Sequence, residues 1–331
     1  MTLVIGIDEA GYGPNLGPLV IGGSVWEVDE TPTSSRAHCD DDRGERFADL
    51  ATAIAADWRD GRGPPWGDSK KVFSRKAGGS ALEPLERGVL AAVLSMEAAL
   101  PATAGFLLDV LGLSLPTDAS QACWRGLAAV PLPQATQAET SQQQADTVRR
   151  RCRQQQLRLV GLACRWVWPA AFNAQLDAGL NKSDILSQVS LGLAHDLRQR
   201  QPTRPATIWC DRHGGRKRYA GVISHCFAAA RVEPLSETAT CSRYRLHDQQ
   251  ATTTIRFTVG GEADLPVAVA SMTAKYIREL AMGAFNQFWA AQRPGVQPTA
   301  GYPVDARRWW QETARQRQQL GIADAALWRR A

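Results

Sequence analysis

The sequence predicts an α/β fold in which a mixed β-sheet is flanked by helices. Short apolar runs of strand length are interspersed with segments of helical periodicity, and they follow no strict βαβ repeat. At 331 residues the chain is long enough for one large domain or two ordinary ones, and no internal repeat divides it. We therefore expect one domain spanning 1–331.

Six apolar or alternating runs have the length and composition of strands. The first two, 3–7 and 19–26, are separated by a glycine-rich loop at 11–18, which is typical of two strands joined by a turn. The other strand candidates are 157–168, 206–210, 241–247 and 252–259.

Five segments are expected to be helical. Between 183 and 199 an apolar residue recurs every fourth position, which indicates an amphipathic helix. The segment 267–289 begins with small residues, which allow close packing against a sheet. The remaining helix candidates are 44–58, 82–99 and 305–318.

Two regions lie outside this regular pattern. The region 101–155 becomes rich in Ala, Gln, Thr and Pro, and we expect an insertion there that is partly helical and partly mobile. The region 290–331 is expected to form a helical C-terminal extension.

The composition excludes several classes of protein. No run approaches the roughly 20 apolar residues of a membrane span, and the N-terminus has no basic leader, so we expect a cytoplasmic protein. The cysteines form no CxxC pair, which argues against a disulfide framework and a structural zinc site. They are Cys39, Cys123, Cys152, Cys164, Cys210, Cys226 and Cys241. The formal charge of +5 suits a nucleic-acid partner without requiring one.

Carboxylates at the ends of predicted strands are the strongest chemical signal. Asp8 and Glu9 end the first strand and precede a Gly-Tyr-Gly loop, Asp211 ends the strand at 206–210, and Glu262 stands in a glycine-bearing loop before a helix. Asp264 is a competing choice for the last of these, and Asp211 alone could be a turn former. Converging acids repel one another unless cations neutralise them, so the set suggests a two-metal phosphodiesterase.

Other chemistries fit the sequence less well. The loop GxGxxxGP at 11–18 is neither the GxGxxG of dinucleotide-binding proteins nor a P-loop, and no GxSxG elbow is present. His213 and His225 do not have metal-ligand spacing with any cysteine pair, and we interpret both as structural.

The carboxylates lie within longer motifs, through which the chain resembles the type 2 ribonucleases H, ribonucleases HII and HIII. GIDEAGYGPNLGPLVIGG (6–23) is similar to the family's opening GxDEAGxGxxxGPxV signature. Further similar segments follow in the family's order: GDSKKV (67–72), NKSDILSQVSLGLAHDL (181–197), TIWCDRHGG (207–215), VGGEADLPVAVASMTAK (259–275) and GYPVDARRWW (301–310). The resemblance implies a ribonuclease H-like fold and extends to about residue 328, interrupted by 101–155.

Residue by residue, the resemblance implies that Asp8, Glu9, Asp211 and Glu262 bind two Mg²⁺ or Mn²⁺ ions. Glu262 departs from the Asp of ribonuclease HII and is similar to the DEDE set of ribonuclease HIII, although the spacing to ASMTAK is one residue short.

The resemblance also implies a substrate-binding set. The backbone of Gly11, Tyr12 and Gly13 would recognise the ribose 2′-hydroxyl, which distinguishes RNA from DNA. Ribonuclease HII commonly has Arg or Lys where this chain has Tyr12. Tyr302 occupies the position of a tyrosine that stacks at the RNA–DNA junction, and Ser69 and Lys70 are candidate phosphate contacts.

The expected activity is endonucleolytic hydrolysis of RNA in RNA/DNA hybrids or at ribonucleotides embedded in DNA, giving 5′-phosphate and 3′-hydroxyl ends. The basic side chains of Lys70, Arg212, Lys217 and Arg218 would hold phosphates, and the region 290–331 would bind substrate. We expect a monomer. Two alternatives remain open: a structure-specific DNA nuclease of the same superfamily, and a non-catalytic nucleic-acid-binding relative.

Overall fold

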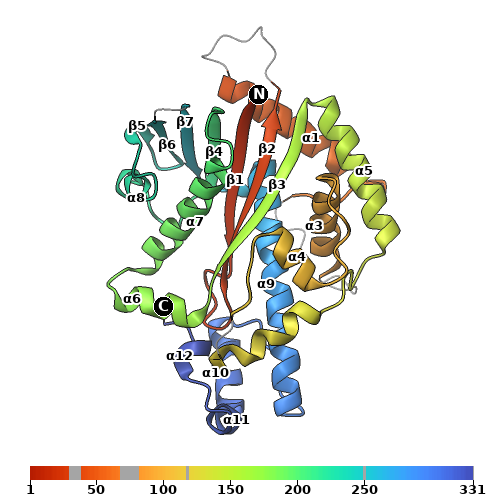
Figure 1. Cartoon of the computed structure of the whole chain (residues 1–331), viewed down its shortest axis with the longest axis vertical. Coiled ribbons are helices and arrows are strands. Elements are labelled where there is room, and N and C mark those ends of the chain that lie inside the picture. Colours follow the sequence, from red (N-terminus) through yellow and green to blue (C-terminus); the bar gives the residue numbers. More distant parts are fainter. Residues whose placement is uncertain (30–38, 68–81, 117–118, 249–250, 331) are drawn as a thin grey trace.

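The computed structural model describes residues 1–29, 39–67, 82–116, 119–248 and 251–330 (Figure 1). Its strands are β1 (Thr2–Ala10), β2 (Leu19–Val28), β3 (Leu157–Val167), β4 (Ala206–Asp211), β5 (Arg231–Glu237), β6 (Cys241–His247) and β7 (Thr253–Thr258). They form one sheet of order β3-β2-β1-β4-β7-β6-β5. β1 pairs antiparallel with β2 but parallel with β4, and β4 pairs parallel with β7. The predicted mixed sheet is confirmed.

Helices cover both faces of this sheet. They are α1 (Cys39–Arg59), α3 (Glu83–Ser95), α4 (Ala104–Val110), α5 (Ala138–Gln154), α6 (Pro169–Asp177), α7 (Lys182–Gln199), α8 (Ala220–Cys226), α9 (Leu265–Gln292), α10 (Pro303–Glu312), α11 (Ala314–Gln319) and α12 (Asp324–Leu327), with 3-10 helices η1 (Ala119–Ala129) and η2 (Gly261–Ala263). α10, α11 and α12 lie together at the end of the molecule to which β1 points (Figure 1). The predicted flanking helices and helical C-terminal region are confirmed.

Alternation along β1 separates two hydrophobic cores. Val4 points into a core shared with α1, α3, α5 and α9. Leu3, Ile5 and Ile7 point into a second core shared with α7 and α8. Because β1 and β4 are parallel neighbours, their C-terminal ends meet at one edge of the sheet. Asp8 and Glu9 at the end of β1 therefore lie beside Asp211 at the end of β4.

Helix α9 lies directly against the backbone of β1 and β2. A Cβ atom at Gly6 would lie 2.6 Å from the Val267 nitrogen, and one at Gly22 would clash with the Ala270 carbonyl. The Ser24 hydroxyl donates a 2.7 Å hydrogen bond to the Pro266 carbonyl. The small residues expected at the start of this helix therefore allow it to pack closely against the sheet. These contacts hold the N-terminal part of α9 against β1 and β2.

We predict that Gly6→Ala destabilises the protein by about 3 kcal/mol, because the new methyl group meets rigid backbone of α9. Urea-induced unfolding measures this change. Gly161→Ala in β3 is the matched control, since its Cβ would lie 3.4 Å from Val25, an ordinary contact. Equal stability of the two variants would contradict the close packing of α9 against β1.

The region 101–155 contributes to the core on the α9 side. Leu107, Trp124 and Val148, from α4, η1 and α5, are buried there. The buried Glu86 carboxylate on α3 accepts hydrogen bonds from the backbone nitrogens of 134–136 and from the Tyr276 hydroxyl. The described residues of this region are thus anchored to α3 and α9, while its origin as an insertion stays a prediction.

Several elements differ from the sequence-based expectation. The helix expected over 305–318 is two helices, α10 and α11, separated at Thr313, whose hydroxyl donates to the Trp309 carbonyl at 2.9 Å. β5 was not expected, because it contains Pro234 and few apolar residues; proline is tolerated in it because β5 is an edge strand. The short helices α6, α8 and α12 also lacked a periodic signal.

The described cysteines are not joined by disulfide bonds. Within the described side chains, Cys123, Cys152, Cys164 and Cys210 are buried free thiols. None of the helices in the described ranges combines the length and apolar character needed to cross a membrane.

Candidate active site

The four predicted acids line one pocket of about 160 Å³ at the C-terminal edge of β1 and β4. They come from β1, β4 and the loop before α9, which are far apart in the sequence. The complete lining within the described residues is Asp8, Glu9, Ala10, Gly11, Asp211, Glu262, Ser271, Lys275, Arg278, Glu279 and Tyr302.

Asp8 is the deepest of these acids, with 5% of its surface exposed. Burial raises the pKa of its carboxyl group well above the usual value, and the charges of Glu9 and Asp211 add to the increase. A hydrogen bond from the Ser271 side chain acts in the opposite direction. Asp8 therefore occupies a place where negative charge is costly and a cation would be stabilising.

A tight glycine turn brings Glu262 beside Asp211. The Gly261 nitrogen donates a 2.8 Å hydrogen bond to Asp211 Oδ1, and a Cβ at Gly261 would lie 2.9 Å from the Asp211 Cα atom. Gly260 has a φ of +70°, which glycine adopts at little cost. Gly260 and Gly261 thus allow η2 to dock on the end of β4.

Asp264 pairs with an arginine and does not line the pocket. Its carboxylate forms a 2.7 Å ion pair with Arg256, whose guanidinium lies 4.0 Å from the centre of the Trp209 ring. Asp264 does not belong to the pocket lining, whereas Glu262 does. Glu262, and not Asp264, therefore lines the same pocket as Asp8, Glu9 and Asp211.

The donor set is all oxygen, which suits Mg²⁺ or Mn²⁺. Within the described residues, no group of three or more His, Cys, Asp or Glu side chains forms a ready-made metal cage. Mg²⁺ commonly binds through one or two carboxylates together with waters and substrate phosphates, so a complete protein cage is not required. The repulsion around Asp8 and the oxygen ligands of the pocket together fit divalent cations.

Four side chains of α9 complete the pocket and were not among the predicted site residues. They are Ser271, Lys275, Arg278 and Glu279. Their spacing of four, three and one residues places them on one face of a helix. Polar residues at this spacing in an otherwise apolar segment were the available signal, and Lys275 already matched a family motif.

Two buried arginines hold the glycine loop that follows β1. Arg278 donates to the Leu16 carbonyl at 3.2 Å, and Arg329 donates to the Gly11 carbonyl at 2.5 Å and to that of Pro14. Gly11 has a φ of +86°, and a Cβ there would lie 2.5 Å from Arg278 Nε. The loop is therefore enclosed by side chains from α9 and from the C-terminal segment.

Tyr302 reaches the same pocket from the start of α10. Its neighbour Gly301 has a φ of +82°, and the Gly301 carbonyl accepts hydrogen bonds from Asn15 and Leu16. Tyr302 itself is 55% exposed. The turn before it thus docks on the glycine loop and leaves the tyrosine ring at the mouth of the pocket.

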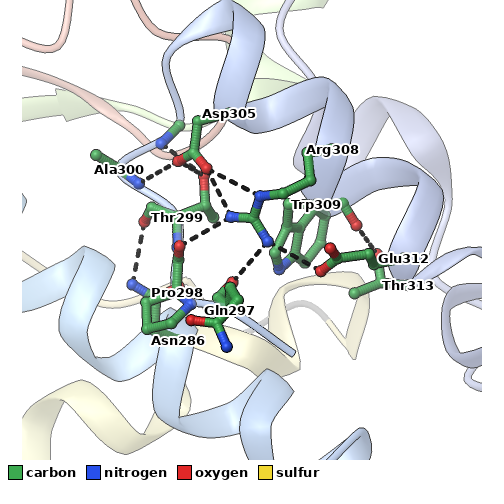
Figure 2. A network of polar contacts seen from close by, with 11 residues as sticks. Asn286, Gln297, Pro298, Thr299, Ala300, Asp305, Arg308, Trp309, Glu312 and Thr313 are labelled. Carbon is green, nitrogen blue, oxygen red and sulfur yellow. Dashed lines mark hydrogen bonds and ion pairs between the residues drawn. The ribbon is translucent and has the colours of Figure 1, made fainter. Parts of the chain in front are cut away.

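A polar network fixes this turn to α9 and α10 (Figure 2). Asp305 accepts hydrogen bonds from the Thr299 hydroxyl at 2.6 Å and from the Ala300 nitrogen at 3.0 Å. Arg308 pairs with both Asp305 and Glu312, at 2.6 and 2.9 Å. The network determines where Tyr302 enters the site.

Arg212, Lys217 and Arg218, predicted to contact phosphates, are not among the residues that line the pocket. The Arg212 guanidinium donates to the Thr238 and Ala239 carbonyls and therefore has a structural role at the β5–β6 turn. Lys217 and Arg218 are exposed on the loop after β4. Ser69 and Lys70 lie outside the described residues, so their predicted phosphate contacts stay predictions.

The buried His213 is structural. Its Nδ1 lies 3.0 Å from the Ser187 hydroxyl, and its backbone nitrogen donates to the Tyr219 hydroxyl. Burial lowers the pKa of His213 to about 3. With this pKa its ring is neutral at physiological pH.

No protein-family model matches the chain, and no curated protein matches it either. Among solved structures, the chain is similar to ribonuclease HII of Archaeoglobus fulgidus, solved with PCNA, with 13% identity, a TM-score of 0.40 and coverage of 98% of this chain and 93% of that one. It is similar to ribonuclease H2 of Pyrococcus horikoshii OT3, with 15% identity, a TM-score of 0.44 and coverage of 98% and 92%. Bst-RNase HIII with Mn²⁺ gives 13% identity, a TM-score of 0.40 and coverage of 99% and 66%. Each of these alignments extends over nearly the whole of this chain.

Proposed function

We propose that this chain is a divalent-metal-dependent endonuclease that hydrolyses RNA in RNA/DNA hybrids or at ribonucleotides embedded in DNA, leaving 5′-phosphate and 3′-hydroxyl ends. The observation that carries the proposal is the convergence of Asp8, Glu9, Asp211 and Glu262 in one pocket beside the glycine loop. Carboxylates next to a cationic helix face are suited to a phosphodiester and divalent ions.

The acids would hold the metal ions. Asp8 is close enough to Glu9 and Asp211 for both of their charges to raise its pKa, so it would hold divalent ions together with them. Divalent ions, when bound, supply charge neutralisation and Lewis-acid activation of water and of the phosphate. Gly261 orients the Asp211 carboxylate for this role through its backbone hydrogen bond.

The remaining side chains of the pocket would bind and select the substrate. Lys275 stands on the α9 face of the pocket, where a cation can hold the phosphate to be cleaved. The backbone of Gly11, Tyr12 and Gly13 would read the 2′-hydroxyl, and the exposed ring of Tyr302 would stack at the mouth. The requirement for a ribonucleotide would follow from recognition of its 2′-hydroxyl by the backbone of this loop.

A cleavage assay with matched duplexes tests the proposal. Three duplexes of one sequence contain no, one or several ribonucleotides in one strand, and each is incubated with Mg²⁺ and then with Mn²⁺. We expect cleavage only where a ribonucleotide is present, with new 5′-phosphate ends, and none after chelation of the metal.

Two outcomes would replace the proposal. Equal cleavage of the all-DNA duplex would point to a structure-specific DNA nuclease. Tight binding of the duplexes without cleavage in either metal would point to a non-catalytic nucleic-acid-binding protein.

A further inference from the structure

Lys182 lies against the glycine loop although it belongs to a distant helix. It is the first residue of α7, and its ammonium nitrogen is 4.7 Å from the centre of the Tyr12 ring. At this distance the ammonium is attracted to the negative face of the ring. The contact joins α7 to the loop that follows β1.

The position is electrostatically unfavourable for a lysine. The first turn of an α-helix carries partial positive charge, so a cation there is destabilising. Burial and the nearby charge of Arg329 both lower the pKa of Lys182. No carboxylate in the described ranges forms an ion pair with Lys182; the nearest candidate on its own helix, Asp184, is already bound to Arg216 and Asn181. The cation–π contact uses the charge of Lys182 but leaves its N–H donors for another partner.

Tyr12 is near both this ammonium and Glu9 of the acid pocket. Tyr12 packs on the core of the α7 side, and the charge of Glu9 contributes to the raised pKa of its hydroxyl. Neither Tyr12 nor Lys182 belongs to the pocket lining, which includes the adjacent Gly11. An anion bound by Lys182 would therefore lie beside the metal-binding acids, across the glycine loop.

Resting on the proposed function, we propose that Lys182, held on the face of Tyr12, binds a phosphate of the nucleic-acid strand that neighbours the phosphate being hydrolysed. The nearby Arg216 is less suitable, because its guanidinium already pairs with Asp184 and contacts Ser183. Lys182 thus acts in substrate binding and register, and the acids act in hydrolysis.

The first test removes the charge of Lys182. Lys182→Met is expected to raise the KM for a duplex with one ribonucleotide about 10-fold, the effect of one charge-assisted hydrogen bond, with kcat changed less than about twofold. The slope of log Kd against log salt concentration should fall by about 0.9, the value for one phosphate contact. Arg200→Met, an exposed cation at the other end of α7, is the matched control and should change neither quantity. Lys182→Arg should restore most of the affinity.

The second test locates the phosphate. Each phosphate of the ribonucleotide-containing strand is replaced in turn by a neutral methylphosphonate. With the wild-type protein, one replacement beside the cleavage site should raise KM about 10-fold. With Lys182→Met that penalty should disappear, because the partner of the phosphate is already absent.

The third test addresses the ring. Tyr12→Leu removes the aromatic face and should raise KM as Lys182→Met does, whereas Tyr12→Phe keeps the face and should raise KM less than Tyr12→Leu does. The double variant should be no worse than either single variant.

The outcomes separate this proposal from the proposed function. If the wild-type protein cleaves no ribonucleotide-containing duplex, the proposed function fails. If it cleaves such duplexes but Lys182→Met behaves like Arg200→Met, or its methylphosphonate profile matches that of the wild type, the role of Lys182 alone is overturned.

Discussion

Asp8→Asn is expected to lower the rate of duplex cleavage by at least about 1000-fold, because it removes the charge of the deepest acid in the pocket without changing its size. Single-turnover assays with the ribonucleotide-containing duplex measure the loss. Affinity for the duplex in the presence of Ca²⁺ should remain within about threefold, since phosphate contacts supply most of the binding.

Asp264→Asn is the matched control for this prediction. It makes the same chemical change a short distance away, in a carboxylate that is paired with Arg256 and does not line the pocket. We expect its rate to fall less than about fivefold, in keeping with the loss of one partly exposed ion pair. If Asp264→Asn were inactive and Glu262→Gln active, the assignment of the fourth acid would be reversed.

The same Asp8 substitution is expected to stabilise the metal-free protein. The pKa of Asp8 is raised in the folded state, so the stability of the folded protein falls as the pH rises from the unfolded pKa towards that raised value. Asn cannot ionise and removes this cost, so the variant should be more stable than the wild type at neutral pH. Below the unfolded pKa of about 3.9 both states are protonated and the gain should vanish. Thermal unfolding in chelator at pH 7 and pH 3.5 measures the difference; greater stability of the wild type at pH 7 would contradict the unfavourable burial of Asp8.

The acids could be predicted from the sequence because each follows a local pattern. Asp8, Glu9 and Asp211 end short apolar runs, and the parallel pairing of β1 with β4 then brings their positions to one edge. Glu262 follows two glycines, and a glycine pair before a helix indicates a tight turn. The positions at which the strands end are thus sufficient to locate most of the acids.

Contacts between distant segments could not be predicted in the same way. Hydrophobic periodicity shows which face of α7 is buried, but it does not show that Lys182 meets Tyr12. It also gives no sign that Arg329, near the C-terminus, crosses back to the glycine loop. The edge strand β5 lacks the alternation of a half-buried strand, because much of its length is exposed.

The contact of Arg329 with the glycine loop leads to a second large effect. Arg329 is 1% exposed, and burial, together with the charge of Arg278, lowers its pKa. Its side chain binds the carbonyls of Gly11 and Pro14, and its backbone nitrogen donates to the Asn15 carbonyl at 2.7 Å. A buried charge held on carbonyls fixes the direction of the neighbouring amides, because the two ends of each peptide plane turn together.

Arg329→Ala is therefore expected to lower kcat/KM for the ribonucleotide-containing duplex about 30-fold, since a loop that reads a hydroxyl must hold its amides within a fraction of an ångström. Binding with Ca²⁺ in place of Mg²⁺ separates positioning from general damage. The preference for the ribonucleotide-containing duplex over the all-DNA duplex should shrink, while affinity for the all-DNA duplex stays within about twofold. Arg330→Ala removes the same charge from the next residue, whose side chain is 56% exposed and pairs with Asp177, and should leave both affinities unchanged. An unchanged preference for the ribonucleotide in Arg329→Ala would mean that the carbonyl contacts of Arg329 support the fold but not recognition.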